Sequence, residues 1–381
     1  MDAPRASPGL PIVLSEWGRI GAVGFGGPPA HLGLLRRLCV ERHSWLSPAE
    51  FEDAIAACNL LPGPASTQLA IYCAWRVRGR IGGLIGGLAF ILPGGIAIVA
   101  LAAVFLARSP PIWIRGAAAG AGAGVAAVAL QAGLSLLPAS RARAQSTSRW
   151  AAYAALGGLA AATVGPWLVL VLVGCGLVEL AATSRPSGRT LSVLVAGAAA
   201  APTGGLAALA WVAFKVGALS YGGGFVIVPL MQSDAVHRNH WLTNAQFLNG
   251  VALGQITPGP VIHTVAVVGY AAAGVGGALL AMAIAFSPSF LFVLLGGRHL
   301  SGLRDNAVAS SFLGGAGPAA IGAILGAAVP LASALQAWWQ FVLLAAATIA
   351  LLVVRRSVLV TLVTLGVIGA LLVGLHAVTA A

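Results

Sequence analysis

The chain has 381 residues, of which 59% are hydrophobic and only 8% are charged, whereas an average soluble domain has roughly 25% charged residues. This composition excludes a water-facing globular surface and fits a chain that crosses a lipid bilayer several times. The net charge of +12 does not indicate a nucleic-acid partner, because the arginines lie in short clusters at the ends of apolar segments, as the positive-inside rule predicts.

The first eleven residues, 1–11, form a short polar tail that contains proline. The tail lacks the charged, apolar and cleavage regions of a signal peptide, so we expect it to remain on the protein. Apolar segments follow along the rest of the chain. They divide it into a first repeat over 12–183, a linker or short span over 184–205, and a second repeat over 206–381.

This division rests on three sequence blocks that occur twice. GRIGAVGFGGP returns as FKVGALSYGGG, RHSWLSPAEF as RNHWLTNAQF, and NLLPGP as QITPGP. Similar membrane segments that arose by chance would not keep three blocks in register, so the pattern indicates a duplication. One offset of 196 residues separates the starts of all three pairs: Gly18 and Phe214, Arg42 and Arg238, Asn59 and Gln255.

Each first block contains a run of glycines inside an apolar segment long enough to cross a bilayer. Glycine weakens a helix, and a following proline lacks the N–H that a helix needs. Close helix packing through small residues would use the same composition. We favour discontinuous helices whose free amides face an anion, since a break in lipid must be satisfied by protein or by a water-filled cavity. The predicted break residues are Pro28 and Gly224, and the glycines predicted to bind the substrate beside them are Gly24, Gly26, Gly27, Gly222 and Gly223.

Arg19 and Lys215 occupy equivalent positions about one helical turn before the glycine runs. Either side chain could extend to the membrane surface. Two cations related by a pseudo-twofold axis would also complement a small dianion, and we take both as substrate-binding residues. Glu16 lies close enough in sequence to pair with Arg19 or to take part in proton coupling, whereas the second repeat has Val212 at that position.

The second blocks have the spacing of capping boxes, Ser47 with Glu50 and Thr243 with Gln246. In a capping box the N-cap side chain and the residue three positions later satisfy each other's backbone N–H groups. A helix is therefore predicted to begin at each box and to run towards the third block.

The third blocks are Pro-Gly-Pro segments, which cannot lie within an uninterrupted helix. A plain loop would explain them. The polar residues around them favour breaks near the middle of the membrane, where N-termini of half-helices offer N–H groups and positive dipole ends to an anion. The predicted break residues are Pro62, Gly63, Pro64, Pro258, Gly259 and Pro260, and the substrate-binding residues predicted around them are Asn59, Gln255, Thr257 and His263.

Each repeat continues with four apolar segments that we expect to be spanning helices. They cover 82–107, 113–137, 150–164 and 166–183 in the first repeat, and 275–297, 307–334, 336–354 and 357–378 in the second. The predicted fold class is an all-α polytopic membrane protein with two repeats, broken helices and about 10–13 transmembrane segments.

The arginines also predict how the repeats are oriented. The loop at 76–80 carries three arginines and its counterpart at 271–277 carries none, whereas Arg298 and Arg304 follow the next span of the second repeat. If arginine-rich loops face the cytoplasm, equivalent loops face opposite sides, and the repeats are inverted as in many secondary transporters. The segment 184–205 supplies the odd crossing that this needs.

The remaining reactive residues indicate no chemistry. We expect no metal site, no disulfide and no cofactor, with the four cysteines acting as small apolar residues: Cys39, Cys58, Cys73 and Cys175. Most histidines are expected at interfaces or in loops: His31, His43, His237, His240, His299 and His376. The chain has no GxSxG, HExxH or P-loop motif, so we expect neither an enzyme nor direct use of ATP.

The two-copy pattern G-x-x-x-[FY]-G-G-[GP], W-[LV]-[ST] and P-G-P resembles the chromate transporter family in its long form, which has two such domains in one polypeptide. The resemblance covers nearly the whole chain. Gly224 stands where the first copy has Pro28, so the halves need not contribute equally. The residues that carry the resemblance are Gly21–Pro28, Trp45–Ser47, Pro62–Pro64, Gly217–Gly224, Trp241–Thr243 and Pro258–Pro260.

The resemblance implies a secondary transporter that exports chromate across the bacterial inner membrane and confers chromate resistance, with sulfate as a competitor. Transport of sulfate or another tetrahedral oxyanion, including uptake, stays open, because dianions of similar size use the same hydrogen-bond donors. A homodimer in the lipid bilayer is compatible with the sequence.

Overall fold

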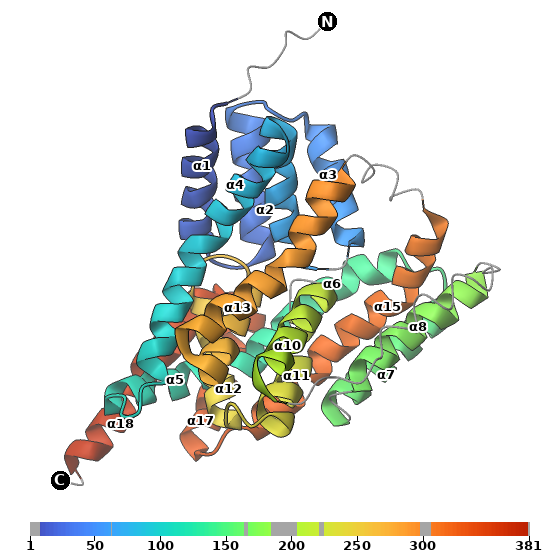
Figure 1. The fold of residues 1–381 in the computed structure, drawn as a ribbon. Helices are drawn as coiled ribbons and strands as arrows, with labels where there is room; N and C mark the ends of the chain where they lie inside the picture. Colours follow the sequence, from blue (N-terminus) through green and yellow to red (C-terminus); the bar gives the residue numbers. More distant parts are fainter. Residues whose placement is uncertain are drawn as a thin grey trace, which may run out of the picture.

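The computed structural model describes residues 8–61, 63–163, 167–183, 204–220, 225–297 and 306–379, and within these ranges it contains helices and no strands (Figure 1). The first repeat contains α1 (Leu10–Val23), α2 (Pro28–Arg36), α3 (Pro48–Leu60), α4 (Ala65–Phe105), α5 (Ile112–Ala123), α6 (Val125–Ala142), α7 (Thr147–Thr163) and α8 (Leu168–Thr183). The second contains α10 (Gly205–Leu219), α11 (Ile227–Gln232), α12 (Asn244–Ile256), α13 (Val265–Gly296), α15 (Ala307–Gly326), α16 (Ala328–Ser333), α17 (Trp338–Thr348) and α18 (Val358–Thr379).

The helices confirm a multi-pass membrane protein. The eight apolar segments expected after the breaks all coincide with a helix or with two consecutive helices. Among the described residues, 5 helical stretches are long and apolar enough to cross a membrane, and three shorter apolar helices accompany them. This is fewer than the expected 10–13 spans, because most helices next to the breaks are too short to cross alone.

The backbone repeats the duplication in detail. A π-helical turn covers Arg37–Arg42 in the first repeat and Ser233–Arg238 in the second, at the same offset of 196 residues. Each is followed by a residue with positive φ, Ser44 at 49° and His240 at 53°. Both predicted capping boxes are formed, so the two helix starts are confirmed. Equivalent sequence blocks therefore adopt the same local structure.

Two long helices fold back on themselves at equivalent places. In α4 the chain turns at Arg78 and Gly79, and Gly79 has φ 68°. In α13 it turns at Ala273 and Gly274, and Gly274 has φ 60°. Each helix consequently has a short first arm and a long second arm, and a second-arm glycine of α4, Gly86, faces Ala74 of its first arm. The loops expected at 76–80 and 271–277 are these tight turns.

The two long second arms, which occupy equivalent places in the two repeats, run antiparallel to each other. Gly83 of α4 faces Leu294 of α13, Gly87 faces Phe290, and Gly95 faces Met282. A twofold axis that relates two antiparallel helices is perpendicular to them. Since both helices are of membrane-spanning length, this axis lies in the plane of the membrane, which is the geometry of inverted repeats.

Small residues also join the two repeats further along the chain. Helix α5 of the first repeat packs along α18 of the second, with Gly116 against Gly369. Helix α15 of the second repeat packs on α8 of the first, with Gly315 against the carbonyl of Cys175. Close backbone approach through glycine is a common way for helices to associate in lipid. The repeats therefore share one core.

Labelling from the two sides of the membrane checks the inversion. Arg80→Cys and Gly276→Cys place a thiol just after each turn, and a Cβ at Gly276 meets no atom within 4 Å. We expect an impermeant maleimide to label these two variants from opposite sides. The native cysteines are all buried, so the unmodified chain should not be labelled and serves as the negative control. Labelling of both variants from one side would contradict inverted repeats.

Candidate functional site

Each Pro-Gly-Pro segment is the tip of a helical hairpin. In the first repeat Glu50, near the start of α3, accepts a hydrogen bond from Arg76, near the end of the first arm of α4. In the second repeat Gly254 of α12 faces Thr264. Both central glycines have positive φ, 121° at Gly63 and 93° at Gly259, a region that side chains disfavour. One helix ends before each of these glycines and another helical segment begins after it, and Pro62 lies outside the described residues.

Each tip lies against the opposite repeat. The backbone N–H of Gly259 donates to the carbonyl of Gly24, at an N to O distance of 2.9 Å. The carbonyl of Pro258 approaches Gly94 so closely that a Cβ there would overlap it. A Cβ at Gly63 would lie 3.3 Å from the hydroxyl oxygen of Ser289. Since Gly94 and Ser289 are 195 residues apart, like the two turns, the two tips meet the two long arms at equivalent points.

His31 of α2 lies in this region and is 0% exposed, so the expectation of an interfacial or loop residue was wrong. Its Nε2 lies 2.9 Å from the carbonyl oxygen of Gly24, and its Nδ1 lies 3.2 Å from the hydroxyl of Ser66. Because a carbonyl can only accept, Nε2 carries a proton. The sequence had a signal for this residue, since His31 follows Pro28 by three positions, as His263 follows Pro260.

His263 is 0% exposed and lies in the 3₁₀ turn Val261–Thr264 that follows the second tip. Its ring meets Phe286 of α13 edge-on, with 5.2 Å between centroids. Among the described residues neither ring nitrogen has a partner with good hydrogen-bond geometry, although the ring faces the backbone of Ile91. The imidazole therefore retains hydrogen-bonding capacity at the contact between the repeats.

Further buried polar atoms near the tips lack a hydrogen-bond partner in the described part of the chain. They are Thr67 Oγ1, Ser220 Oγ, Ser289 Oγ and Gln255 Nε2. We call these residues together with His263 the polar cluster. A buried polar group without a partner costs about 1–3 kcal/mol, and native proteins retain few of them. Five such residues from both repeats, beside two helix breaks, are the features expected of a site for a polar ligand.

The predicted cations have carboxylate partners instead. Arg19 is 55% exposed and pairs with Glu16 at 2.9 Å, which confirms that pair. Lys215 pairs with the buried Asp234. No hydrogen bond or ion pair joins either cation to a Pro-Gly-Pro segment in the described ranges. Direct binding of the substrate by Arg19 and Lys215 stays a prediction. In this conformation Lys215 has its own carboxylate partner, whereas Arg19 shares Glu16 with Arg42.

The other predicted residues lie at or near the breaks. Gly24 ends α1, Gly26 and Gly27 have positive φ, and Pro28 is the first residue of α2. Thr257 is buried, and its hydroxyl donates to the carbonyl of Gly254. Asn59 is exposed and lines a cavity, whereas Pro64 and Pro260 directly precede helical turns. Three residues lie outside the described ranges: Gly222, Gly223 and Gly224.

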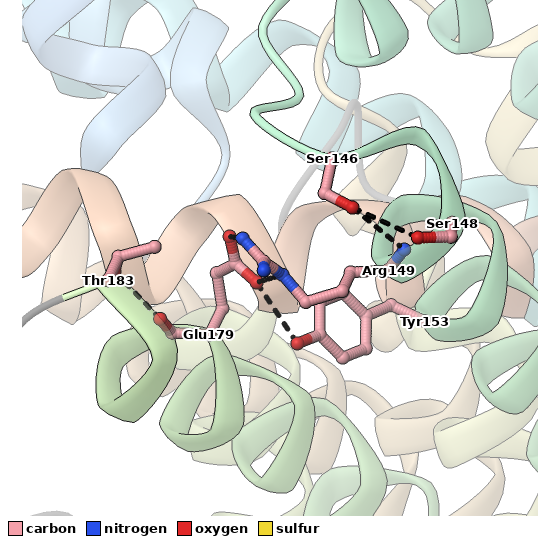
Figure 2. A network of polar contacts seen from close by, with 6 residues as sticks. All are labelled: Ser146, Ser148, Arg149, Tyr153, Glu179 and Thr183. Atoms are coloured by element: carbon pink, nitrogen blue, oxygen red, sulfur yellow. Dashed lines mark hydrogen bonds and ion pairs between the residues drawn. The ribbon is translucent and has the colours of Figure 1, made fainter.

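A second polar network joins α7 to α8 (Figure 2). The buried carboxylate of Glu179 accepts two hydrogen bonds from Arg149, at 2.8 and 3.1 Å, and a third from the hydroxyl of Tyr153 at 3.0 Å. A carboxylate in an apolar helix is costly unless it is paired in this way. The sequence did not predict this network, because Glu179 belongs neither to the repeated blocks nor to a motif.

Glu179→Ala is expected to lower the free energy of unfolding by about 1–3 kcal/mol, because Arg149 and Tyr153 lose their acceptor. Thermal unfolding in detergent measures this change. Thr183→Ala is the control, because its hydroxyl bonds only the Glu179 carbonyl of the preceding turn, and it should have little effect. Equal stability of the two variants would show that the network does not hold α7 on α8.

The sequence model of the family described as "Chromate transporter" matches residues 12–180 and 207–372, one match in each repeat. A chromate transport protein from Cupriavidus metallidurans is 32% identical over 372 residues, covering 94% of this chain and 91% of the relative. A probable chromate transport protein from Synechococcus elongatus is 31% identical, covering 82% of each chain.

A chromate transport protein from Pseudomonas aeruginosa is 30% identical, covering 84% of this chain and 81% of the relative. No solved structure matches the chain. The two family matches coincide with the two repeats, and the relatives are aligned over most of their length. The chain belongs to the chromate transporter family.

Proposed function

We propose that this protein is a secondary transporter that exports chromate across the bacterial inner membrane by alternating access, and thereby confers chromate resistance. The observation that carries the proposal is the pair of hairpin tips, each seated on the opposite repeat and surrounded by the polar cluster. Membership of a transport family supports the same conclusion.

The tips offer the kind of donors that a tetrahedral dianion accepts. Helix N-termini begin just after Pro64 and Pro260, and such ends bind anions through free N–H groups and the helix dipole. The hydroxyls of Ser220 and Ser289 and the imidazole of His263 add further donors. Neutral donors can hold a dianion and release it again without a buried fixed charge, which a transporter requires.

Inverted repeats provide a route for the motion. When two repeats are related by an axis in the membrane plane, exchanging their conformations converts a state open on one side into a state open on the other. Each tip lies against the opposite repeat, so rocking one repeat against the other alters access to both tips. Proton or potential coupling would supply the energy, since no P-loop is present in the sequence.

Chromate uptake into inside-out membrane vesicles tests this proposal. We expect energised vesicles that contain the protein to accumulate radiolabelled chromate, and sulfate to compete with it. Accumulation in right-side-out vesicles only would contradict export. Transport of sulfate without chromate would favour the second candidate, a transporter of another tetrahedral oxyanion, which the same donors would recognise. Absence of transport of either anion would overturn the proposed function.

A further inference from the structure

A cavity of about 430 Å³ lies beside the tip of the first repeat, between α3, α6 and α15. Its wall includes Asn59 from α3, Ser140 from α6, Arg143 just after α6, and Ser310 from α15, and Gly63 of the tip also borders it. The volume exceeds what a small hydrated oxyanion needs. The cavity therefore reaches the helix break at Gly63 and is lined by residues of both repeats.

Gly63 connects this cavity to the polar cluster. It borders the cavity, and a Cβ on it would lie 3.3 Å from the Ser289 hydroxyl. Position 63 carries no side chain, and the side chains nearest to an added Cβ would be the amide of Gln68, at 2.6 Å, and the buried hydroxyl of Ser289, which lacks a partner in the described ranges. Gly63 thus lies between a ligand in the cavity and the proposed site.

The charge around the cavity suits an anion. Arg143 is the one charged side chain among its lining residues, and it is exposed. The nearest side of α15 carries Gly314, which faces Glu179. That carboxylate does not repel an anion strongly, because Arg149 and Tyr153 already bind it (Figure 2). An uncompensated cation in a cleft concentrates anions and raises their association rate.

The tip of the second repeat is covered instead. Asn59 of α3 is exposed, whereas the amide nitrogen of its equivalent, Gln255 of α12, is buried. Helix α5 lies directly on α12, with Gly122 against the side chain of Asn249. Helices α3 and α12 occupy equivalent places in the two repeats, so the two tips differ in their exposure in this conformation.

The open side is the arginine-rich side. Arg141, Arg143 and Arg149 cluster around the junction of α6 and α7, and short loops rich in arginine face the cytoplasm. We infer that the cavity is a cytoplasmic vestibule that admits a small oxyanion dianion to the first tip, with Arg143 as its positioning residue, while the second tip is closed. This inference rests on the proposed function and adds a route, a residue and a side to it.

Transport kinetics test the role of Arg143. Arg143→Gln should raise the KM for chromate about tenfold and leave the maximal rate unchanged, and Arg143→Lys should restore most of the affinity. The difference from the unmodified protein should shrink at high ionic strength, because salt screens an exposed charge. Arg141→Gln is the matched control, an exposed arginine two residues away that does not line the cavity. Equal KM values for Arg143→Gln and Arg141→Gln would overturn the role of Arg143.

Accessibility tests the vestibule without relying on transport. In inside-out vesicles an anionic, impermeant thiol reagent should label Asn59→Cys and Ser310→Cys but not Gln255→Cys, and chromate should slow the labelling. The inference would be overturned if only Gln255→Cys were labelled, or if neither Asn59→Cys nor Ser310→Cys were labelled. If the protein moved no oxyanion but this labelling pattern held, the proposed function would fail and the vestibule would stand.

Discussion

Gly259→Ala is expected to reduce chromate transport to background. Gly259 has φ 93°, and a left-handed conformation costs roughly 1–2 kcal/mol for residues with a Cβ. An added Cβ would also lie 2.9 Å from the His263 ring, which must then shift. The tip would retreat from Gly24, whose carbonyl accepts the Gly259 N–H. Initial rates of chromate uptake, normalised to the amount of protein in the vesicles, measure the loss.

Gly274→Ala is the control that distinguishes the strain of a positive φ at alanine from the loss of the contact made by the second tip. Gly274 also has positive φ, 60°, but a Cβ there meets nothing within 4 Å. This variant should lose some stability and keep most of its transport. If the two variants transported equally well, the contact between the second tip and the first repeat would have no part in transport.

Ser289→Ala is expected to raise the KM for chromate roughly 10–100-fold, because a hydrogen bond to a charged group contributes about 1.5–3 kcal/mol. The hydroxyl is 0% exposed and has no protein partner in the described ranges. Its removal should leave the thermal stability of the ligand-free protein unchanged or slightly higher, since burial of an unsatisfied polar group is unfavourable. A structural hydroxyl would show the opposite effect on stability.

Ser287→Ala is the matched control for this variant. Ser287 lies two residues earlier on α13, and its hydroxyl donates to the carbonyl of Ile284 at 2.8 Å, a carbonyl that Pro288 leaves without its usual helical partner. Its loss should lower stability slightly and leave KM unchanged. Equal KM values for the two serine variants would remove Ser289 from the proposed site.

Local chemistry made part of the structure predictable. Proline and glycine ended helices at Gly24 and around Gly63 and Gly259, and the capping boxes at Ser47 and Thr243 began helices, because these effects depend on a few neighbouring residues. The fixed offset between the blocks then predicted two repeats. Antiparallel packing of α4 on α13 agrees with the inversion that the arginine distribution had indicated.

Contacts between the repeats were not predictable in the same way. Gly94 and Ser289 carry no motif, and their meeting with the tips depends on how two distant segments cross. His31 was missed although its spacing from Pro28 matches that of His263 from Pro260, because spacing alone does not distinguish a buried histidine from an interfacial one. The cations show the opposite case, because Arg19 and Lys215 stood out in the sequence but each has a carboxylate partner. The partner of Arg19, Glu16, was a candidate from the sequence, whereas the partner of Lys215, Asp234, is identified only by the fold.

Anomalous scattering from chromium in crystals soaked with chromate would locate the substrate. We expect the strongest peak at the contact between the repeats, within hydrogen-bond distance of Ser289 or His263. A weaker peak is expected in the vestibule near Arg143. Strong peaks at Arg19 and Lys215, with none beside Gly63 or Gly259, would overturn the proposed site and would assign the substrate to the paired cations.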